Sequence, residues 1–111
     1  SRFVRVAFYQ ASAPQQETAL ETVFQCFHIL NNFDIPVGIE FPLGQVPCDI
    51  PSATQWTSVT DMRNHVIYYR TMYNSVIRNI DLRSIDFSTV RYRAVSMDGT
   101  KRQAVETIKI E

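Results

Sequence analysis

The stretch QWTSVTDMRNHVIYYRTMYNSVIRNIDL, residues 55–82, decides the fold. It is rich in β-branched and aromatic residues, which favour strands, and turn-forming residues divide it into three runs. The predicted strands and the turns between them are Gln55–Thr60, Asp61–Asn64, His65–Met72, Asn74–Ser75 and Val76–Leu82. Because turns this short join neighbouring antiparallel strands, the stretch predicts an antiparallel meander.

A helix is predicted upstream of the meander. Ser12 can cap its first turn, Gln15 can reach back as in a capping box, and proline is tolerated there. From there to about Asn31, apolar residues recur at helical spacing, at Leu20, Val23, Phe24, Phe27 and Leu30. One wide apolar face is typical of a helix that packs on a sheet.

The residues Phe3–Tyr9 predict a first strand, since they are β-branched or aromatic and contain no breaker. Strand alternation then places Arg2 on the same face as Val4, Val6 and Phe8. A guanidinium on an apolar face is costly unless a carboxylate, a thiolate or carbonyl oxygens receive it. Arg2 is therefore a candidate functional residue, with a frayed chain end as the alternative.

The connection Phe33–Thr54 is long and rich in proline and glycine, which is typical of functional or assembly loops. Its apolar residues (Ile35, Val37, Ile39, Phe41, Leu43 and Val46) predict a packed loop that contributes to subunit contacts. The segments Val90–Met97 and Ala104–Ile110, with a turn at Asp98–Gly99, predict a short terminal hairpin or tail. Strand, helix, long loop and antiparallel meander together predict the α+β class.

The composition excludes several classes of protein. A chain of 111 residues is one domain at most, and its 45% of hydrophobic residues can fill a core. Eleven basic residues balance eleven acidic ones, which argues against a binder of nucleic acid. No apolar run approaches the roughly 20 residues that cross a bilayer, so no membrane partner is expected. Since no Met precedes the first predicted strand, we expect that an upstream segment has been removed.

Cysteine and histidine chemistry is not indicated. Cys26 and Cys48 belong to no CxxC pair, and a disulfide between them stays open. A nucleophile–base pair of Cys26 and His28 is disfavoured, because residues two apart point to different sides of a helix. His28 and His65 lack ligand spacing, so we expect no metal and no cofactor.

The aromatic residues of the meander could stack nucleobases, but the neutral charge favours cross-strand packing instead. These residues are Trp56, Tyr68, Tyr69 and Tyr73. The arginines nearby are predicted to be solvated or paired with Asp61 and Asp81; they are Arg63, Arg70 and Arg78.

Four blocks in order resemble the C-terminal part of the choloylglycine hydrolase family, which contains bile salt hydrolases and penicillin V acylases. They are SRFVRVAF (1–8), FHILN (27–31), WTSV (56–59) and YYRTMYN (68–74). The resemblance extends from Ser1 to about Phe87. The stretch Asn32–Gly38 resembles the Gram-negative, Bacteroides-type branch of the family. Membership of this branch implies a periplasmic or secreted protein, whereas a protein of another branch is expected in the cytoplasm.

The resemblance implies the αββα sandwich of an N-terminal-nucleophile hydrolase, with residues 1–111 as the C-terminal part of its single domain. The nucleophile would be a cysteine at the mature N-terminus of the missing portion, with its own α-amino group as base. Arg2 corresponds to the family's arginine beside that cysteine, and its implied role is to favour the thiolate and stabilise transition-state charge.

The implied function is cleavage of a linear amide C–N bond, chiefly in bile acids conjugated to glycine or taurine. Penicillin V acylase is the alternative within this family. A non-catalytic binding or assembly module is the alternative outside it, with residues 33–54 making subunit contacts. We expect the N-terminal portion of the same enzyme as a partner, a small amide substrate and a homotetramer. Alone, the chain should be inactive.

Overall fold

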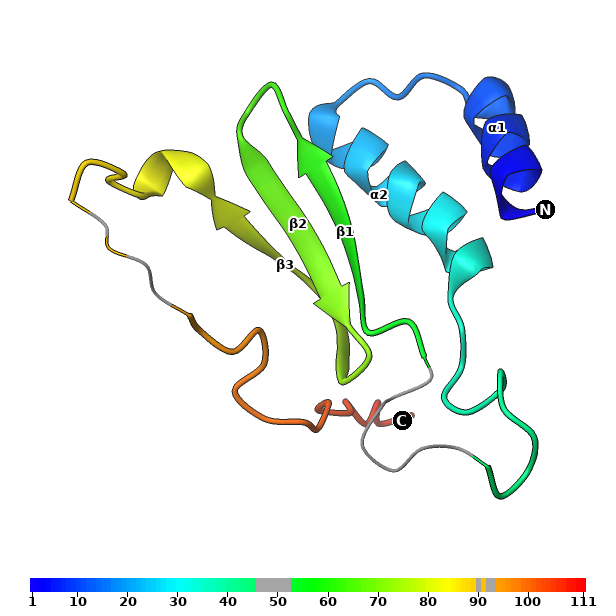
Figure 1. The fold of residues 1–111 in the computed structure, drawn as a ribbon. Coiled ribbons are helices and arrows are strands. Elements are labelled where there is room, and N and C mark those ends of the chain that lie inside the picture. The colour runs from blue at the N-terminus through cyan, green and yellow to red at the C-terminus, as the bar shows by residue number, and fades with distance from the viewer. Residues whose placement is uncertain (46–52, 90, 92–93) are drawn as a thin grey trace.

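A three-stranded antiparallel sheet and two helices make up the fold in the computed structural model (Figure 1). The structure describes residues 1–45, 53–89, 91 and 94–111. The helices are α1 (Arg2–Ser12) and α2 (Ala19–Leu30), with short 3₁₀ turns at Asn31–Phe33 and Leu82–Ser84. The strands are β1 (Trp56–Asp61), β2 (Val66–Thr71) and β3 (Asn74–Asp81).

The predicted meander is confirmed. The strands lie in the order β1-β2-β3, and both neighbouring pairs are antiparallel. Each predicted strand boundary lies within two residues of the observed one. The second turn is shifted by two residues: Met72 and Tyr73 form it, and the predicted turn residues Asn74 and Ser75 are the first residues of β3.

Helix α2 begins later than the sequence indicated. The hydroxyl of Thr18 accepts a hydrogen bond from the backbone N–H of Glu21 at 3.1 Å, and the Glu21 carboxylate accepts from the Thr18 N–H at 3.2 Å. This reciprocal pair is a capping box, and it satisfies N–H groups that the first helical turn leaves unpaired. The prediction of Ser12 and Gln15 as the helix start was therefore wrong.

Helix α2 packs on β1 through its apolar stripe. Val23 and Phe27, at 3% exposure each, are the buried hydrophobic residues in the described part of the chain. The guanidinium of Arg70 lies 5.4 Å from the centre of the Phe27 ring, so a cation covers the aromatic face from the sheet side.

The strand predicted for Phe3–Tyr9 was wrong, because these residues form most of helix α1. Ser1 caps the helix, its hydroxyl accepting from the Val4 N–H at 3.5 Å. Arg2, Arg5 and Tyr9 are three and four residues apart, which places them on one face of a helix. All three donate hydrogen bonds to the turn that follows α2, so helical spacing provides contacts that a strand would not.

The long connection is tied at its two ends. The N–H of Ile35 donates to the Thr54 hydroxyl at 2.9 Å, and the Thr54 N–H donates to the Ile35 carbonyl at 3.1 Å. Between these ends, Val37 and Ile39 are about two-thirds exposed and Leu43 is fully exposed, so the predicted packing of the loop is wrong within this chain. Cys48 and Val46 lie outside the described residues.

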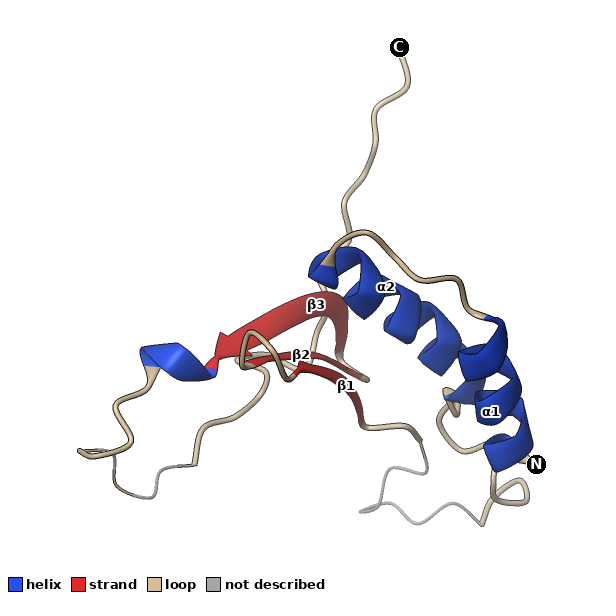
Figure 2. Cartoon of the chain, turned by 90° about the horizontal axis from the view of Figure 1, so that it is seen from above, coloured by secondary structure: helices blue, strands red, loops and turns tan. Residues whose placement is uncertain are grey.

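Of the two predicted alternatives, a terminal hairpin or a tail, residues 94–111 form the tail, since they contain no strand. Ser96–Gln103 follows the end of the sheet, where Asp98 and Gln103 are hydrogen-bonded to β2 and β3 residues. Seen from above, the last residues extend away from the helices and the sheet (Figure 2).

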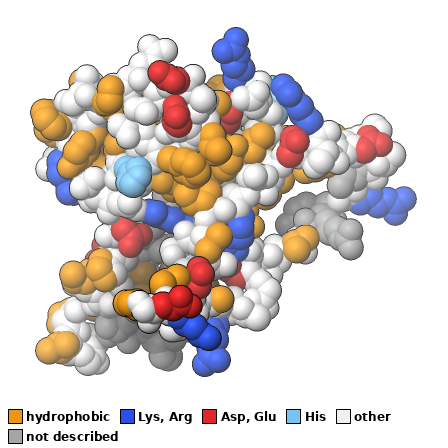
Figure 3. Space-filling model, turned by 180° about the vertical axis from the view of Figure 1, so that it is seen from behind, with side chains coloured by type: hydrophobic (Ala, Val, Ile, Leu, Met, Phe, Trp, Pro, Cys, Tyr) orange, Lys and Arg blue, Asp and Glu red, His pale blue; other side chains and the backbone are white. Residues whose placement is uncertain are grey.

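Large apolar side chains remain open to solvent on this chain. Helix α1 buries none of its residues, and Phe3 and Phe8 are 79% and 66% exposed. Figure 3 shows hydrophobic side chains gathered in the middle of one face of the molecule. Such contiguous apolar surface is typical of an interface rather than of an isolated soluble domain.

Candidate active site

Arg2 is the first residue of α1, and its side chain turns toward the segment that follows α2. Its Nη2 donates to the carbonyl oxygen of Phe33 at 3.2 Å, and the guanidinium carbon lies 5.6 Å from the centre of the Phe33 ring. The strand face from which this residue was singled out does not form, and Arg2 lies exposed at the start of a helix. Its role in catalysis stays a prediction.

A second guanidinium lies at the same aromatic ring. The guanidinium carbon of Arg5 is 5.0 Å from the centre of the Phe33 ring, and its Nη1 donates to the Asn32 carbonyl at 3.4 Å. The hydroxyl of Tyr9 donates to Oδ1 of Asn32 at 3.3 Å. The residues that end α2 therefore fix the face of α1 that carries both arginines.

Arg2 lines a small cavity between α1, the end of α2 and the start of β1. Its volume is about 240 Å³. Its lining residues are Arg2, Leu30, Phe33, Thr54, Trp56, Thr57 and Ser58. A guanidinium has five N–H donors, and the one bonded to Phe33 leaves others that can receive an anion in this cavity. The N-terminus of α1 adds its own partial positive charge at the same place.

A larger, mainly apolar groove lies beside this cavity. It has a volume of about 500 Å³ and separates α1 from α2 and β1. Leu30 and Ser58 line both spaces, so the groove and the Arg2 cavity are neighbours. Cys26 is a half-buried free thiol that also lines the groove.

The histidines are not brought to this site. His28 is exposed on α2, and His65 is exposed in the turn between β1 and β2, with a left-handed φ of 58°. In the described residues, no group of three or more His, Cys, Asp or Glu side chains is placed to hold a metal ion. Over the same residues, neither helix has the length or apolar character to cross a bilayer.

The aromatic cluster is only partly packed. Tyr68, Tyr69 and Tyr73 are half-buried, but Trp56 is 59% exposed, so cross-strand core packing was the wrong prediction for Trp56. Trp56 is one of the residues that line the Arg2 cavity.

The predicted pairing of the meander arginines was wrong for Arg78. Its Nη1 forms a salt bridge with Oδ1 of Asp98 at 2.7 Å, not with Asp81, and its guanidinium lies 4.8 Å from the centre of the Tyr69 ring. Sequence analysis missed Asp98 as a polar anchor because its partners lie 20 and 27 residues upstream. A lone acidic residue in a polar tail carries no pattern that indicates such contacts.

Comparison with known proteins identifies the family. Residues 1–100 match the model of the linear amide C–N hydrolases, choloylglycine hydrolase family. The chain belongs to this family. The choloylglycine hydrolase resemblance inferred from the four sequence blocks is thereby confirmed, while its Bacteroides-type branch, the subunit number and the cellular location stay predictions.

Relatives of this choloylglycine hydrolase family chain are considerably longer. It is 34% identical over 86 residues to the bile salt hydrolase/transferase of Lactiplantibacillus plantarum (strain ATCC BAA-793 / NCIMB 8826 / WCFS1), a match that covers 74% of this chain and 24% of that protein. It is 32% identical over 87 residues to an uncharacterized protein of Paramecium bursaria Chlorella virus 1, covering 78% of this chain and 25% of the viral protein. The chain thus spans about a quarter of the length of these relatives.

The crystal structure of a mutant conjugated bile acid hydrolase from Clostridium perfringens has a similar fold. The TM-score is 0.66 over 97% of this chain and 31% of that one, at 24% sequence identity. This likeness confirms the predicted α+β class and the relation to the N-terminal-nucleophile hydrolase fold. At this identity it describes the fold alone.

Proposed function

We propose that this chain is the arginine-bearing part of an enzyme that hydrolyses a linear amide C–N bond, with conjugated bile acids as substrates. The observation that carries the proposal is the placement of Arg2 in a cavity at the N-terminus of α1. The family membership supports the reaction class, and the relative named bile salt hydrolase/transferase supports the substrate class.

The nucleophile is proposed to be the N-terminal cysteine of the rest of the enzyme. Its α-amino group takes the thiol proton, and the thiolate sulfur then forms a bond to the amide carbonyl carbon. The C–N bond breaks as the resulting ammonium returns its proton to the leaving nitrogen. Water attacks the thioester that remains, which releases the acid and restores the thiol.

Arg2 acts on charge in this scheme. A guanidinium near the sulfur stabilises the thiolate over the thiol and so lowers the thiol pKa. The same donors stabilise the negative charge that develops on the carbonyl oxygen as sulfur attacks. The carbonyl of Phe33 and its ring hold the guanidinium in place without neutralising it, because neither carries a formal charge.

The test is the pH dependence of iodoacetamide labelling of that cysteine in the full-length enzyme. In Arg2→Ala the labelling profile should move to higher pH, and hydrolysis of a glycine-conjugated bile acid should fall by about a hundredfold. Arg2→Lys should keep much of the labelling profile and still lose activity, because an ammonium lacks the planar fork of donors.

Arg5→Ala is the matched control. Arg5 contacts the same ring and the neighbouring carbonyl but does not line the cavity, so its loss should leave the labelling profile unchanged. Superimposable profiles for wild type and Arg2→Ala would contradict the proposed role.

Two further outcomes would favour the alternative functions. If the full-length enzyme hydrolyses penicillin V in preference to bile acid conjugates, penicillin V acylase replaces bile salt hydrolase as the function. If the full-length protein has no N-terminal cysteine, it is a non-catalytic module.

A further inference from the structure

Trp56 separates the Arg2 cavity from a second cavity. This second space has a volume of about 280 Å³ and lies on the tail side of the sheet. Trp56, Thr71 and Tyr73 line it together with Met97, Asp98 and Lys101 from the tail. Because Trp56 lines both cavities, the strand end that carries it forms a wall of the Arg2 cavity as well as of the second one.

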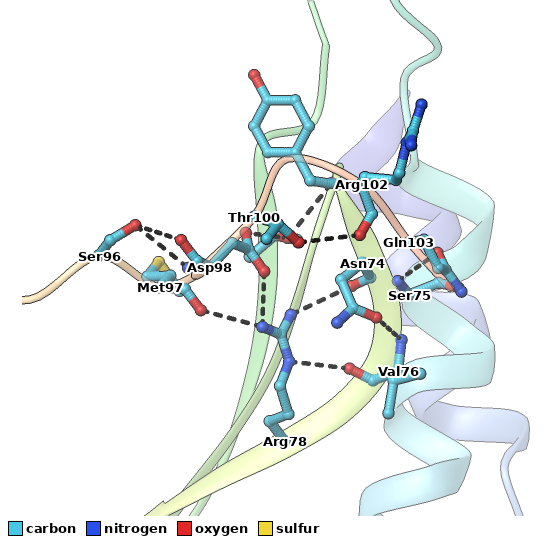
Figure 4. Close-up of polar contacts among 12 residues, drawn as sticks. Asn74, Ser75, Val76, Arg78, Ser96, Met97, Asp98, Thr100, Arg102 and Gln103 are labelled. Carbon is cyan, nitrogen blue, oxygen red and sulfur yellow. Dashed lines mark hydrogen bonds and ion pairs between the residues drawn. The ribbon is translucent and has the colours of Figure 1, made fainter. Parts of the chain in front are cut away.

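The tail is fixed at this second cavity by the Asp98 carboxylate (Figure 4). Oδ2 accepts from the Thr71 hydroxyl at 2.6 Å, and Oδ1 accepts from Nη1 of Arg78 at 2.7 Å. Nη1 of Arg78 also donates to the Met97 carbonyl at 3.0 Å. The side chain of Asp98 is only 10% exposed, so both contacts are largely shielded from solvent.

A second contact holds the tail a few residues later. The backbone N–H and the hydroxyl of Ser75 lie 2.9 and 3.0 Å from Oε1 of Gln103. Residues Ser96–Gln103 are therefore attached to the sheet at two points, one on β2 and β3 and one at the start of β3.

Thr71 connects this anchor to Trp56. The two residues are register partners at the end of the β1–β2 pair, and just beyond them the Met72 N–H donates to the Gln55 carbonyl at 2.9 Å. Thr71 is 9% exposed, and its Oγ1 also lies 3.3 Å from the Tyr73 N–H. Asp98 thus holds the residue that faces Trp56 across the sheet.

We propose that Asp98 is a positioning residue of the enzyme: through Thr71 it fixes the strand end that carries Trp56, and thereby the shape of the cavity at Arg2. The segment Ser96–Lys101, which lines the second cavity, then supports the active site from the other side of Trp56 and is not a passive tail. The expected change in kcat/KM rests on the proposed function. The expected change in the surroundings of Trp56 does not depend on any substrate.

The experiment uses the full-length enzyme with 5-fluorotryptophan incorporated and the ¹⁹F resonance of Trp56 assigned by Trp56→Phe. In Asp98→Asn, that resonance should shift or broaden. Its kcat/KM for a glycine-conjugated bile acid should fall about tenfold, mainly through KM, as expected for a displaced wall rather than a lost catalytic group. Thr71→Val should change the Trp56 resonance and KM in the same way as Asp98→Asn. Thr71→Ser keeps the hydroxyl, so its resonance and KM should match those of the wild type.

Asp86→Asn is the matched control, because Asp86 is an exposed carboxylate whose partners, Ser88 and Thr89, are local and remote from the cavities. It should leave the Trp56 resonance and KM unchanged. A lower melting temperature of Asp98→Asn with an unchanged resonance and KM would overturn the inference. If the wild type hydrolyses no conjugate, the proposed function fails, while the Trp56 resonance still decides whether Asp98 positions the indole.

Discussion

At the scale of single residues, hydrogen bonds from neighbouring side chains stabilise the charged carboxylates of this chain. The hydrogen bond from the Thr71 hydroxyl lowers the pKa of Asp98 below its ordinary value and outweighs the opposing effect of burial, and the Arg78 guanidinium lowers this pKa further. Asp61 and Asp86 have lowered pKa values for the same kind of reason, since Asn64 and Ser88 donate hydrogen bonds to them. Each of these carboxylates is more stable as an anion in the folded chain than in the unfolded one.

We expect the Asp98 anchor to weaken in acid. Its pKa is lowered on folding, so its contribution to stability is complete above the unfolded value of about 4 and is lost as the pH falls through the lower folded value. The melting temperatures of full-length wild type and Asp98→Asn should therefore differ at pH 6, and the difference should shrink as the pH falls below about 4. A difference that stays constant over this range would show that the carboxylate charge does not stabilise the tail.

Residue roles were only partly readable from the sequence. The strand alternation first applied to Arg2 is overturned by helix α1, and the role of Arg2 stays a proposal. Arg2 was singled out through its match to a family block. Asp98 and the exposed indole of Trp56 were not, because their surroundings are made by residues that the turns and the tail bring together. Long-range contacts of this kind leave no periodic signal in a single sequence.

At the scale of elements, local chemistry explains both what was predicted and what was not. The strands of the meander combine suitable propensity with short turns, and they formed as expected. Residues 3–9 have equal strand propensity, but they form a helix that places Arg2, Arg5 and Tyr9 on one face toward Asn32 and Phe33. Tertiary contacts therefore outweigh β-propensity, which is strongly dependent on context.

The capping box of α2 provides a test at this scale. Thr18→Ala removes the acceptor for the Glu21 N–H and should lower the free energy of unfolding by about 1 kcal/mol in urea denaturation of the full-length protein. Ser12→Ala, at the position first expected to cap a helix, should change it by less than about 0.5 kcal/mol, because Ser12 is the last residue of α1. The reverse order of the two effects would place the functional cap at Ser12.

At the scale of the whole molecule, the described residues bury little apolar surface. Val23 and Phe27 form the buried apolar contact between α2 and the sheet, whereas α1 buries none of its residues and much of the described part of the long connection is exposed. The chain also spans only 24% and 25% of its two curated relatives. The apolar groove between α1, α2 and β1 is also consistent with this, because protein interiors are close-packed and a groove of this size between two helices requires apolar side chains from another part of the enzyme to fill it.

We therefore predict that the isolated 111-residue chain does not fold cooperatively. The two apolar side chains that are buried among the described residues cannot offset the conformational entropy of ordering a chain of this length, which is about 1–2 kcal/mol per residue for the backbone alone. Calorimetry of the isolated chain should show no sharp heat-absorption peak, while the same residues within the full-length enzyme should melt in a single transition. A cooperative transition from the monomeric chain would contradict this prediction, because it would mean that the exposed faces of α1 and the sheet need no partner surface.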